Sequence, residues 1–180
     1  MDVKILNLLP VTADVMTPEI FAYMCKYLEP TTTVETYQIT VGPPSIECEY
    51  DEALAAPNVL ELCQKAEKEG FQAIFINCFG DPAVKAAREL VNIPVFGGFE
   101  PATHFALGLA DKISIVTVLP NVVSLMEGNI AKAHLDKRVV SIRNVNIPVE
   151  ELQDHEKLCQ ALVEQSKAAI EHDGAQAIVM

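Results

Sequence analysis

The sequence predicts an α/β fold with two similar lobes, in which parallel sheets are flanked by helices. Short apolar strands alternate with helical segments along the 180 residues, and this alternation is typical of parallel sheets covered by helices. Two stretches also recur in the same order. Residues 5–10 (ILNLLP) resemble residues 115–120 (IVTVLP), and residues 70–76 (GFQAIFI) resemble residues 174–180 (GAQAIVM). The two recurrences together indicate a duplicated α/β unit.

The pair Gly97-Gly98 marks the boundary between the lobes, so we expect an N-terminal lobe over residues 1–96 and a second lobe over residues 97–180. Ligands of such sheets bind outside the carboxyl ends of the strands, which predicts a site in the cleft between the lobes. The second recurrence stops at Met180, and a sheet that ended there would have an open edge. We therefore expect the second lobe to be truncated at its C-terminal end.

In the first lobe, turn and capping residues delimit the elements. Thr17 is the expected N-cap of a helix that Pro18 opens, and Pro57 interrupts a later helix that Gly70 ends. The Gly- and Pro-rich stretch 41–47 is a stiff loop. We expect strands at residues 3–9, 33–39, 72–78 and 94–96, and helices at residues 18–28, 51–69 (capped by Asp51) and 82–91.

The second lobe shows the same alternation of strands and helices. Strands are expected at residues 112–118, 139–145 and 176–180, and helices at residues 101–109, 121–135 and 149–173. A break near Asp154 interrupts the last of these helices.

Composition and charge exclude several classes of protein. The net charge is −12, from 13 basic and 25 acidic residues, and no basic stripe is present, which argues against nucleic-acid binding. No 18-residue apolar run predicts a membrane span, and the N-terminus enters a strand without a signal peptide. Five widely spaced cysteines favour a reducing cytoplasm over a disulfide framework. No cysteine or histidine spacing indicates a metal site, and we expect a cytoplasmic homo-oligomer acting on a small molecule.

Cys78 is the most informative residue. It follows the apolar run 73–77 and precedes Phe79-Gly80-Asp81-Pro82, which predicts a strand running into a helix with Asp81 as N-cap and Pro82 in the first turn. The helix dipole would favour the reactive thiolate. The alternative is a free cysteine that only packs in the core. For the other cysteines packing is favoured: Cys25, Cys48, Cys63 and Cys159.

Five further residues are candidates for substrate binding, each with a plainer explanation. The backbone amides of Phe79 and Gly80 could bind an anionic oxygen, although a simple strand–helix turn accounts for the same residues. The first recurrence makes Asn7 and Thr117 equivalent, each at the carboxyl end of the first strand of its lobe. The plainer explanation for Thr117 is a β-branched side chain that only packs in the core. The Asn7 amide needs a partner if buried, and neighbouring backbone would suffice. Glu47 either reaches the cleft or is solvated, and solvation is the favoured interpretation.

Several stretches resemble the hydantoin racemase branch of the aspartate/glutamate racemase superfamily, a branch that includes allantoin racemases. They are residues 42–47 (GPPSIE), 50–57 (YDEALAAP), 78–82 (CFGDP), 86–90 (AAREL) and 114–117 (SIVT). The resemblance spans nearly the whole chain, and the CFGDP string is fairly specific to this branch.

The resemblance implies two α/β lobes related by a pseudo-twofold, with the site between them. It implies racemisation without a cofactor by two cysteines, one from each lobe, of which Cys78 is the first. The second would follow Met180 in a Gly-Cys pair. The substrate carbanion would be held as an enolate by the amides of Phe79 and Gly80 and the Thr117 hydroxyl.

The chain departs from the family pattern at two positions. The family's first strand ends Asn-Pro-Asn-Thr, where this chain has Asn7 followed by Leu8-Leu9-Pro10. A pair of threonines is usual after the second-lobe strand, whereas Thr117 is followed by Val118. Val118 is thus also expected among the substrate-binding residues, with one possible donor fewer than in the family.

The sequence thus favours a racemase or epimerase of a 5-substituted hydantoin or allantoin. Two alternatives stay open. One is another enzyme of the superfamily, either an aspartate or glutamate racemase or a one-thiol decarboxylase or isomerase. The other is a non-catalytic small-molecule binding protein with an ordinary thiol at Cys78, because fold alone does not decide function.

Overall fold

The computed structural model describes residues 2–180, and the chain divides into two compact units. The first unit contains the residues up to Ile46 together with Tyr50–Gly98. The second contains Phe99–Met180 and takes up the short segment Glu47–Glu49. Each unit is built around a parallel sheet of its own.

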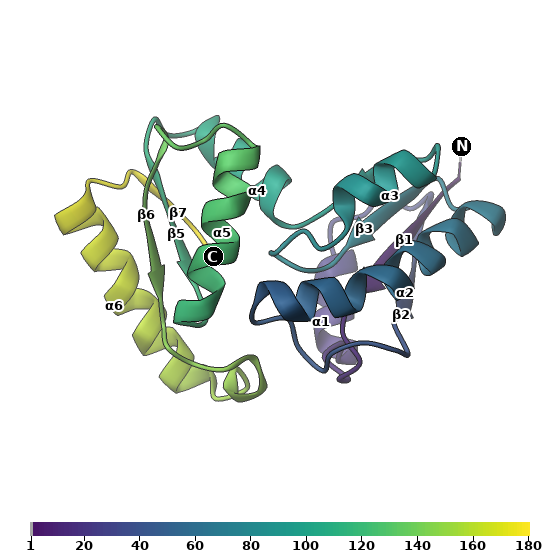
Figure 1. Cartoon of the computed structure of the whole chain (residues 1–180), viewed down its shortest axis with the longest axis horizontal. Helices are drawn as coiled ribbons and strands as arrows, with labels where there is room; N and C mark the ends of the chain where they lie inside the picture. The colour runs from purple at the N-terminus through teal and green to yellow at the C-terminus, as the bar shows by residue number, and fades with distance from the viewer. Residues whose placement is uncertain (1) are drawn as a thin grey trace. The chain divides into compact units, whose positions relative to one another are not determined.

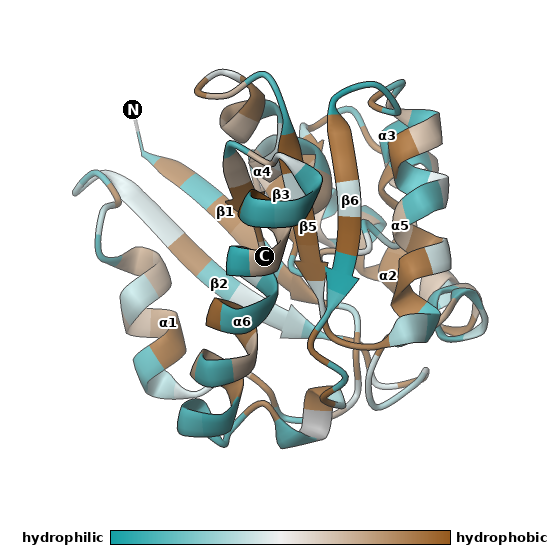
Figure 2. Cartoon of the chain, turned by 90° about the vertical axis from the view of Figure 1, so that its left-hand side faces the viewer, coloured by the Kyte–Doolittle hydropathy of each residue, from teal (hydrophilic) through white to brown (hydrophobic). Residues whose placement is uncertain are grey.

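The first unit has a four-stranded parallel sheet with the strand order β2-β1-β3-β4. Its elements are β1 (Val3–Leu9), α1 (Pro18–Cys25), β2 (Thr32–Gln38), α2 (Glu49–Lys68), β3 (Ala73–Ile76), α3 (Val84–Leu90) and β4 (Val95–Phe96). Figures 1 and 2 show α1 on the side of β1 and β2 away from α2 and α3.

The hydrophobic core of this unit lies on the face of the sheet that α2 and α3 cover. Leu6, Ile74 and Val95 are register partners on neighbouring strands, and all three are at most 2% exposed. α2 adds Val59 and Cys63, both fully buried, to the same core. Because side chains alternate along a strand, the next residue of each strand points to the opposite face.

The second unit repeats this topology in a three-stranded parallel sheet with the order β6-β5-β7. Its elements are α4 (Phe99–Leu107), β5 (Ile113–Thr117), α5 (Pro120–Lys132), β6 (Val139–Asn144), the 3₁₀ turn η1 (Val149–Glu151), α6 (His155–Asp173) and β7 (Ala177–Val179). In both units the first strand is central, the second strand lies on one side and the third on the other. The predicted α/β class with parallel sheets and flanking helices is confirmed.

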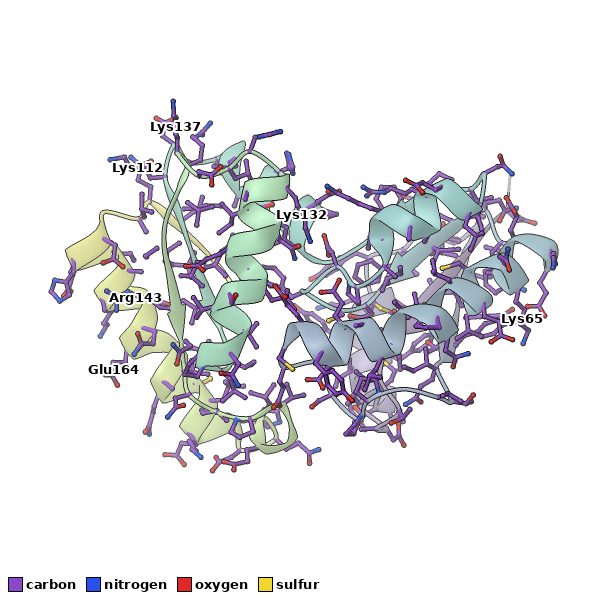
Figure 3. All side chains as sticks on the ribbon, viewed as in Figure 1. Lys65, Lys112, Lys132, Lys137, Arg143 and Glu164 are labelled. Atoms are coloured by element: carbon purple, nitrogen blue, oxygen red, sulfur yellow. The ribbon has the colours of Figure 1, made fainter. Side chains whose placement is uncertain are left out.

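An ion pair fastens α6 to the sheet of the second unit. Arg143 in β6 donates from Nε to Oδ2 of Asp173 at 2.7 Å and from Nη2 to Oδ1 at 3.0 Å. Figure 3 labels Arg143 between β6 and α6. This bidentate contact lowers the pKa of the Asp173 carboxyl to about 2, chiefly through the hydrogen bond from Arg143.

Several predicted helices differ from the observed ones by two or three residues at an end, and two differ in how they begin or continue. α2 begins at Glu49 and runs without a break through Pro57, so Asp51 lies inside the helix and does not cap it. Pro57 and Ala53 are both exposed, so water can satisfy the carbonyl that the proline leaves without an amide partner. The helix predicted from Pro82 begins only at Val84.

The late start of α3 has a backbone cause. Asp81 has a φ of 54° and Ala83 a φ of 58°, both in the left-handed region, where an α-helix cannot begin. Ala83 is the N-cap, without a side-chain hydrogen bond. The prediction that Asp81 caps this helix is therefore wrong.

The predicted equivalence of Asn7 and Thr117 is also wrong, by two residues. Ile5 pairs with Ala73 in the first sheet, and Ile113 pairs with Ala177 in the second. With these pairs matched, Thr117 corresponds to Leu9, the last residue of β1. Asn7 lies two residues before that end.

Candidate active site around Cys78

The backbone of Cys78 is held on both sides, just past the end of β3. Its amide donates to the Ile76 carbonyl at 2.9 Å. Its carbonyl accepts from the amides of Asp81 at 3.2 Å and Gly98 at 3.3 Å. The backbone N–H and C=O of Cys78 are therefore both hydrogen-bonded, and three separate contacts hold the backbone of this residue in place.

Gly97 and Gly98 allow the loop that carries Cys78 to lie against the end of β4. A Cβ atom at Gly98 would lie 3.1 Å from the Cys78 carbonyl oxygen and 3.2 Å from the Phe79 Cα atom. A Cβ atom at Gly97 would overlap the Asp81 carboxylate. The glycine pair is thus required by a close approach of two backbone segments, a role that sequence reasoning missed by treating the pair only as a boundary.

The environment of Cys78 favours the protonated thiol. Burial raises its pKa to about 11, and the negative charges of Asp81 and Glu52 act in the same direction. The backbone amide of Gly80 donates to the sulfur and opposes this shift. The thiolate expected from the sequence is therefore not the favoured resting form, because burial, together with the charges of Asp81 and Glu52, outweighs the hydrogen bond from Gly80.

Of the two amides predicted to bind substrate, that of Gly80 is engaged with the Cys78 sulfur. Gly80 is buried and Phe79 is half-buried. Together with Asp81 they form the turn that the Cys78 carbonyl closes. In this structure the turn holds the Gly80 amide where it donates a hydrogen bond to the sulfur.

Asn7 is buried in the first unit, with 1% of its surface exposed. Its Nδ2 donates to the Thr36 hydroxyl at 3.1 Å, and its Oδ1 has no hydrogen-bond partner among the described residues. The predicted pairing with neighbouring backbone is thus replaced by a side-chain contact that satisfies half of the amide. A buried acceptor without a donor costs free energy.

Thr117 and Val118 lie at the carboxyl end of β5 in the second unit. Thr117 is 9% exposed, and its carbonyl accepts from the Val145 amide at 2.9 Å. The Val118 carbonyl accepts from the Ile147 amide at 3.2 Å. The role of both residues in substrate binding stays a prediction.

Glu47 is not simply solvated. It is half-buried, and its Oε1 accepts from the Val149 amide at 2.9 Å, at the start of η1. The Glu47 carboxylate therefore binds the first backbone amide of a 3₁₀ turn that lies 102 residues further along the chain. No local sequence signal predicts a contact of this span.

In the described part of the chain, no three or more His, Cys, Asp or Glu side chains gather in a way that would hold a metal ion. None of the helices described is long and apolar enough to span a membrane.

Comparison with known proteins identifies the family. The sequence profile of the family described as Asp/Glu/Hydantoin racemase matches residues 5–180. The chain belongs to this racemase family. Members are isomerases, and the resemblance predicted from the sequence is confirmed.

Individual members of the family are similar to this chain in sequence and in structure. The hydantoin racemase of Pseudomonas sp. (strain NS671) is 36% identical over 100% of this chain and 72% of its own length. That of Paenarthrobacter aurescens is 31% identical over 98% of this chain and 76% of its own. The solved structure of the allantoin racemase from Klebsiella pneumoniae has a TM-score of 0.91 and 34% identity, and the match covers 98% of this chain and 73% of that one.

Proposed function

We propose that this racemase family member interconverts the enantiomers of a 5-substituted hydantoin, a class that includes allantoin, without a cofactor. The observation that carries the proposal is the 36% identity over the whole chain with a hydantoin racemase. The similarity to an allantoin racemase, with a TM-score of 0.91, supports the same ring as substrate.

The chemistry of the ring suits a thiol. The C5–H bond of a hydantoin is acidified by the adjacent C4 carbonyl, so a base can remove the proton and leave the electron pair on an enolate. Inversion then requires an acid that returns a proton to C5 from the opposite face. One proton leaves the substrate and one enters it, so the reaction needs no oxidant or reductant.

Cys78 is one of these two groups in our proposal. With a pKa of about 11 it rests as the thiol, so it is the proton donor to the substrate enantiomer whose C5–H faces away from it. The S–H bond then breaks and the Gly80 amide, which donates to the sulfur, stabilises the thiolate that forms. For the other enantiomer the same thiolate is the base.

We infer the second group from the internal repeat. Ala73 and Ala177 occupy the same register position in the two sheets, at a spacing of 104 residues, so the residue that would correspond to Cys78 is number 182, outside the 180 residues of the sequence. The described residues therefore supply the first proton-transfer group and its surroundings.

Loss of optical rotation tests the proposal. The optical rotation of single enantiomers of 5-substituted hydantoins, allantoin, aspartate and glutamate is followed above the buffer rate. An arylmalonate has no optical rotation, so its turnover is followed by the carbon dioxide that it releases. We expect turnover of the hydantoins, a loss of about 100-fold or more in Cys78→Ser, and unchanged activity in the control Cys159→Ser, since Cys159 is exposed on α6. Turnover confined to the amino acids or the diacid would refute the assigned substrate, and an active Cys78→Ser would refute the role of the thiol.

A further inference from the structure

The turn that follows β3 has an unusual backbone. Of the four non-glycine residues with a positive φ in the described chain, two lie in this turn, Asp81 at 54° and Ala83 at 58°. The Asp81 amide donates to the Cys78 carbonyl at 3.2 Å, and the Asp81 carbonyl accepts from the Val84 amide at 3.3 Å. Such a backbone persists only where the surrounding structure holds it in place, and Asp81 is at the centre of these contacts.

The side chain of Asp81 packs against the segment that follows β4. Its carboxylate fills the space that a Cβ atom of residue 97 would need, so only glycine fits there. The next residue of that segment, Gly98, donates its amide to the Cys78 carbonyl at 3.3 Å. One short segment thus contacts both the half-buried Asp81 and the residue with the thiol, which keeps the carboxylate in the turn that carries the sulfur.

Two carboxylates act on the proton of the Cys78 thiol. Burial is the main cause of the raised pKa of Cys78, and the negative charges of Asp81 and Glu52 raise it further. Glu52 belongs to α2, whereas Asp81 lies three residues after Cys78 in the same turn. The Gly97-Gly98 segment adds no charged side chain, and the Gly80 amide acts in the opposite direction. Asp81 is therefore the charged group that the turn itself supplies.

We propose that Asp81 is a positioning residue for the proton transfers of Cys78: its carboxylate holds the turn against Gly97 and keeps the proton on the sulfur until the substrate carbanion takes it. The proposal rests on the proposed racemisation. In the donating step the S–H bond breaks, a C5–H bond forms, and a thiolate is left near the carboxylate. Repulsion between these two anions makes the thiolate a stronger base, so it removes the C5 proton of the other enantiomer more readily.

A plainer role for Asp81 is the turn alone, because aspartate tolerates a left-handed backbone better than most residues. Asparagine and glycine tolerate this backbone as well, and neither carries a charge. Asp81→Asn and Asp81→Gly therefore keep the turn and remove the charge. The matched control is Asp136→Asn, which removes one charge at an exposed position between α5 and β6.

The pH dependence of Cys78 alkylation separates the two roles without any substrate. The peptide that contains Cys78 is followed by mass spectrometry after reaction with iodoacetamide between about pH 7 and pH 11, and the urea midpoint of each variant is measured alongside. We expect the profiles of both Asp81 variants to move to lower pH, so that at about pH 8 their Cys78 reacts about threefold or more faster than that of the wild type. Asp136→Asn should follow the wild-type profile.

Racemisation gives a second readout. For the hydantoin enantiomer that Cys78 protonates, kcat/KM should fall at high pH as the free thiol loses its proton. This alkaline limb should move to lower pH in both Asp81 variants, a shift that a purely structural role does not produce.

Three results would overturn the proposal. They are a wild-type alkylation profile in both Asp81 variants, an equal shift in Asp136→Asn, and loss of the fold in both Asp81 variants, since the carboxylate would then serve folding alone. A shifted alkylation profile in a protein that racemises no hydantoin would instead refute the proposed function, and the effect of Asp81 on the thiol would stand.

Discussion

At the scale of single residues, the protonation of Cys78 governs what the site can do before substrate arrives. Burial, Asp81 and Glu52 raise the pKa of the thiol, and only the Gly80 amide opposes them. A thiol held in this way is protected from oxidants and alkylating agents, whose partner is the thiolate. The same thiol is a ready proton donor.

Alkylation as a function of pH measures this pKa. At pH 8, Cys78 should react with iodoacetamide about 100-fold more slowly in the folded chain than in the unfolded chain, because its pKa is raised from 9.0 to about 11. Modification is followed by mass spectrometry of the peptide that contains Cys78. Reaction in the folded chain at or above the unfolded rate would show that the thiolate is favoured after all.

The close approach at Gly98 gives a second prediction at this scale. Gly98→Ala should lower the racemase activity about tenfold or more and destabilise the fold by roughly 1–3 kcal/mol, because its Cβ would press on the Cys78 carbonyl oxygen at 3.1 Å. Gly128→Ala is the matched control, since nothing lies within 4 Å of its Cβ position in α5. That control should be more stable by about 0.5–1 kcal/mol. Equal activity in the two variants would argue against the packing role of Gly98.

At the scale of elements, the ion pair between Arg143 in β6 and Asp173 in α6 is sensitive to pH. Arg143 holds the pKa of Asp173 at about 2, below the ordinary value of 3.8. A lowered folded-state pKa contributes stability that is present above pH 3.8 and is lost as the pH falls through about 2.

The urea midpoint of Asp173→Asn measures this contribution. The variant should be clearly less stable than the wild type at pH 7, and the difference should shrink between pH 4 and pH 2. Asp111→Asn is the control, because the Asp111 side chain is 93% exposed in its ion pair with Arg138 and such pairs contribute little. A difference that does not change with pH would contradict the linkage to Asp173.

Much of the element pattern could be predicted from local residues. Thr17 caps α1 with a hydrogen bond from the Ile20 amide, and Asp154 caps α6 in the same way from Lys157. The alternation of strands and helices was sufficient for the fold class, because apolar runs and capping residues are local signals.

The site was less accessible from the sequence because its contacts are long-range. The Asp81 carboxylate packs over Gly97, and Asp81 has a left-handed backbone where a helix cap was expected. Glu47 finds its partner at Val149. Sequence reasoning identified Cys78 as the candidate, but its pKa depends on the burial and the charges that folding creates.

At the scale of the whole molecule, the two units repeat one strand topology. Both units have the first strand inside a parallel sheet, and in each the same Gly-x-Gln-Ala-Ile sequence leads into the third strand, which begins at its alanine. A duplicated unit offers two equivalent strand ends, and stereoinversion requires two groups on opposite faces of one carbon. The proposed reaction therefore uses the duplication itself.

Exchange of the C5 proton in deuterated water tests the central claim, that Cys78 transfers this proton. The two enantiomers of a 5-substituted hydantoin are incubated separately with the protein, and the C5–H signal of each is followed by NMR above the buffer rate. The account predicts loss of the signal with the wild type and with Cys159→Ala. With Cys78→Ala it predicts a rate at least about 100-fold lower for the enantiomer whose C5–H faces Cys78. Exchange of both enantiomers at the wild-type rate in Cys78→Ala would contradict it.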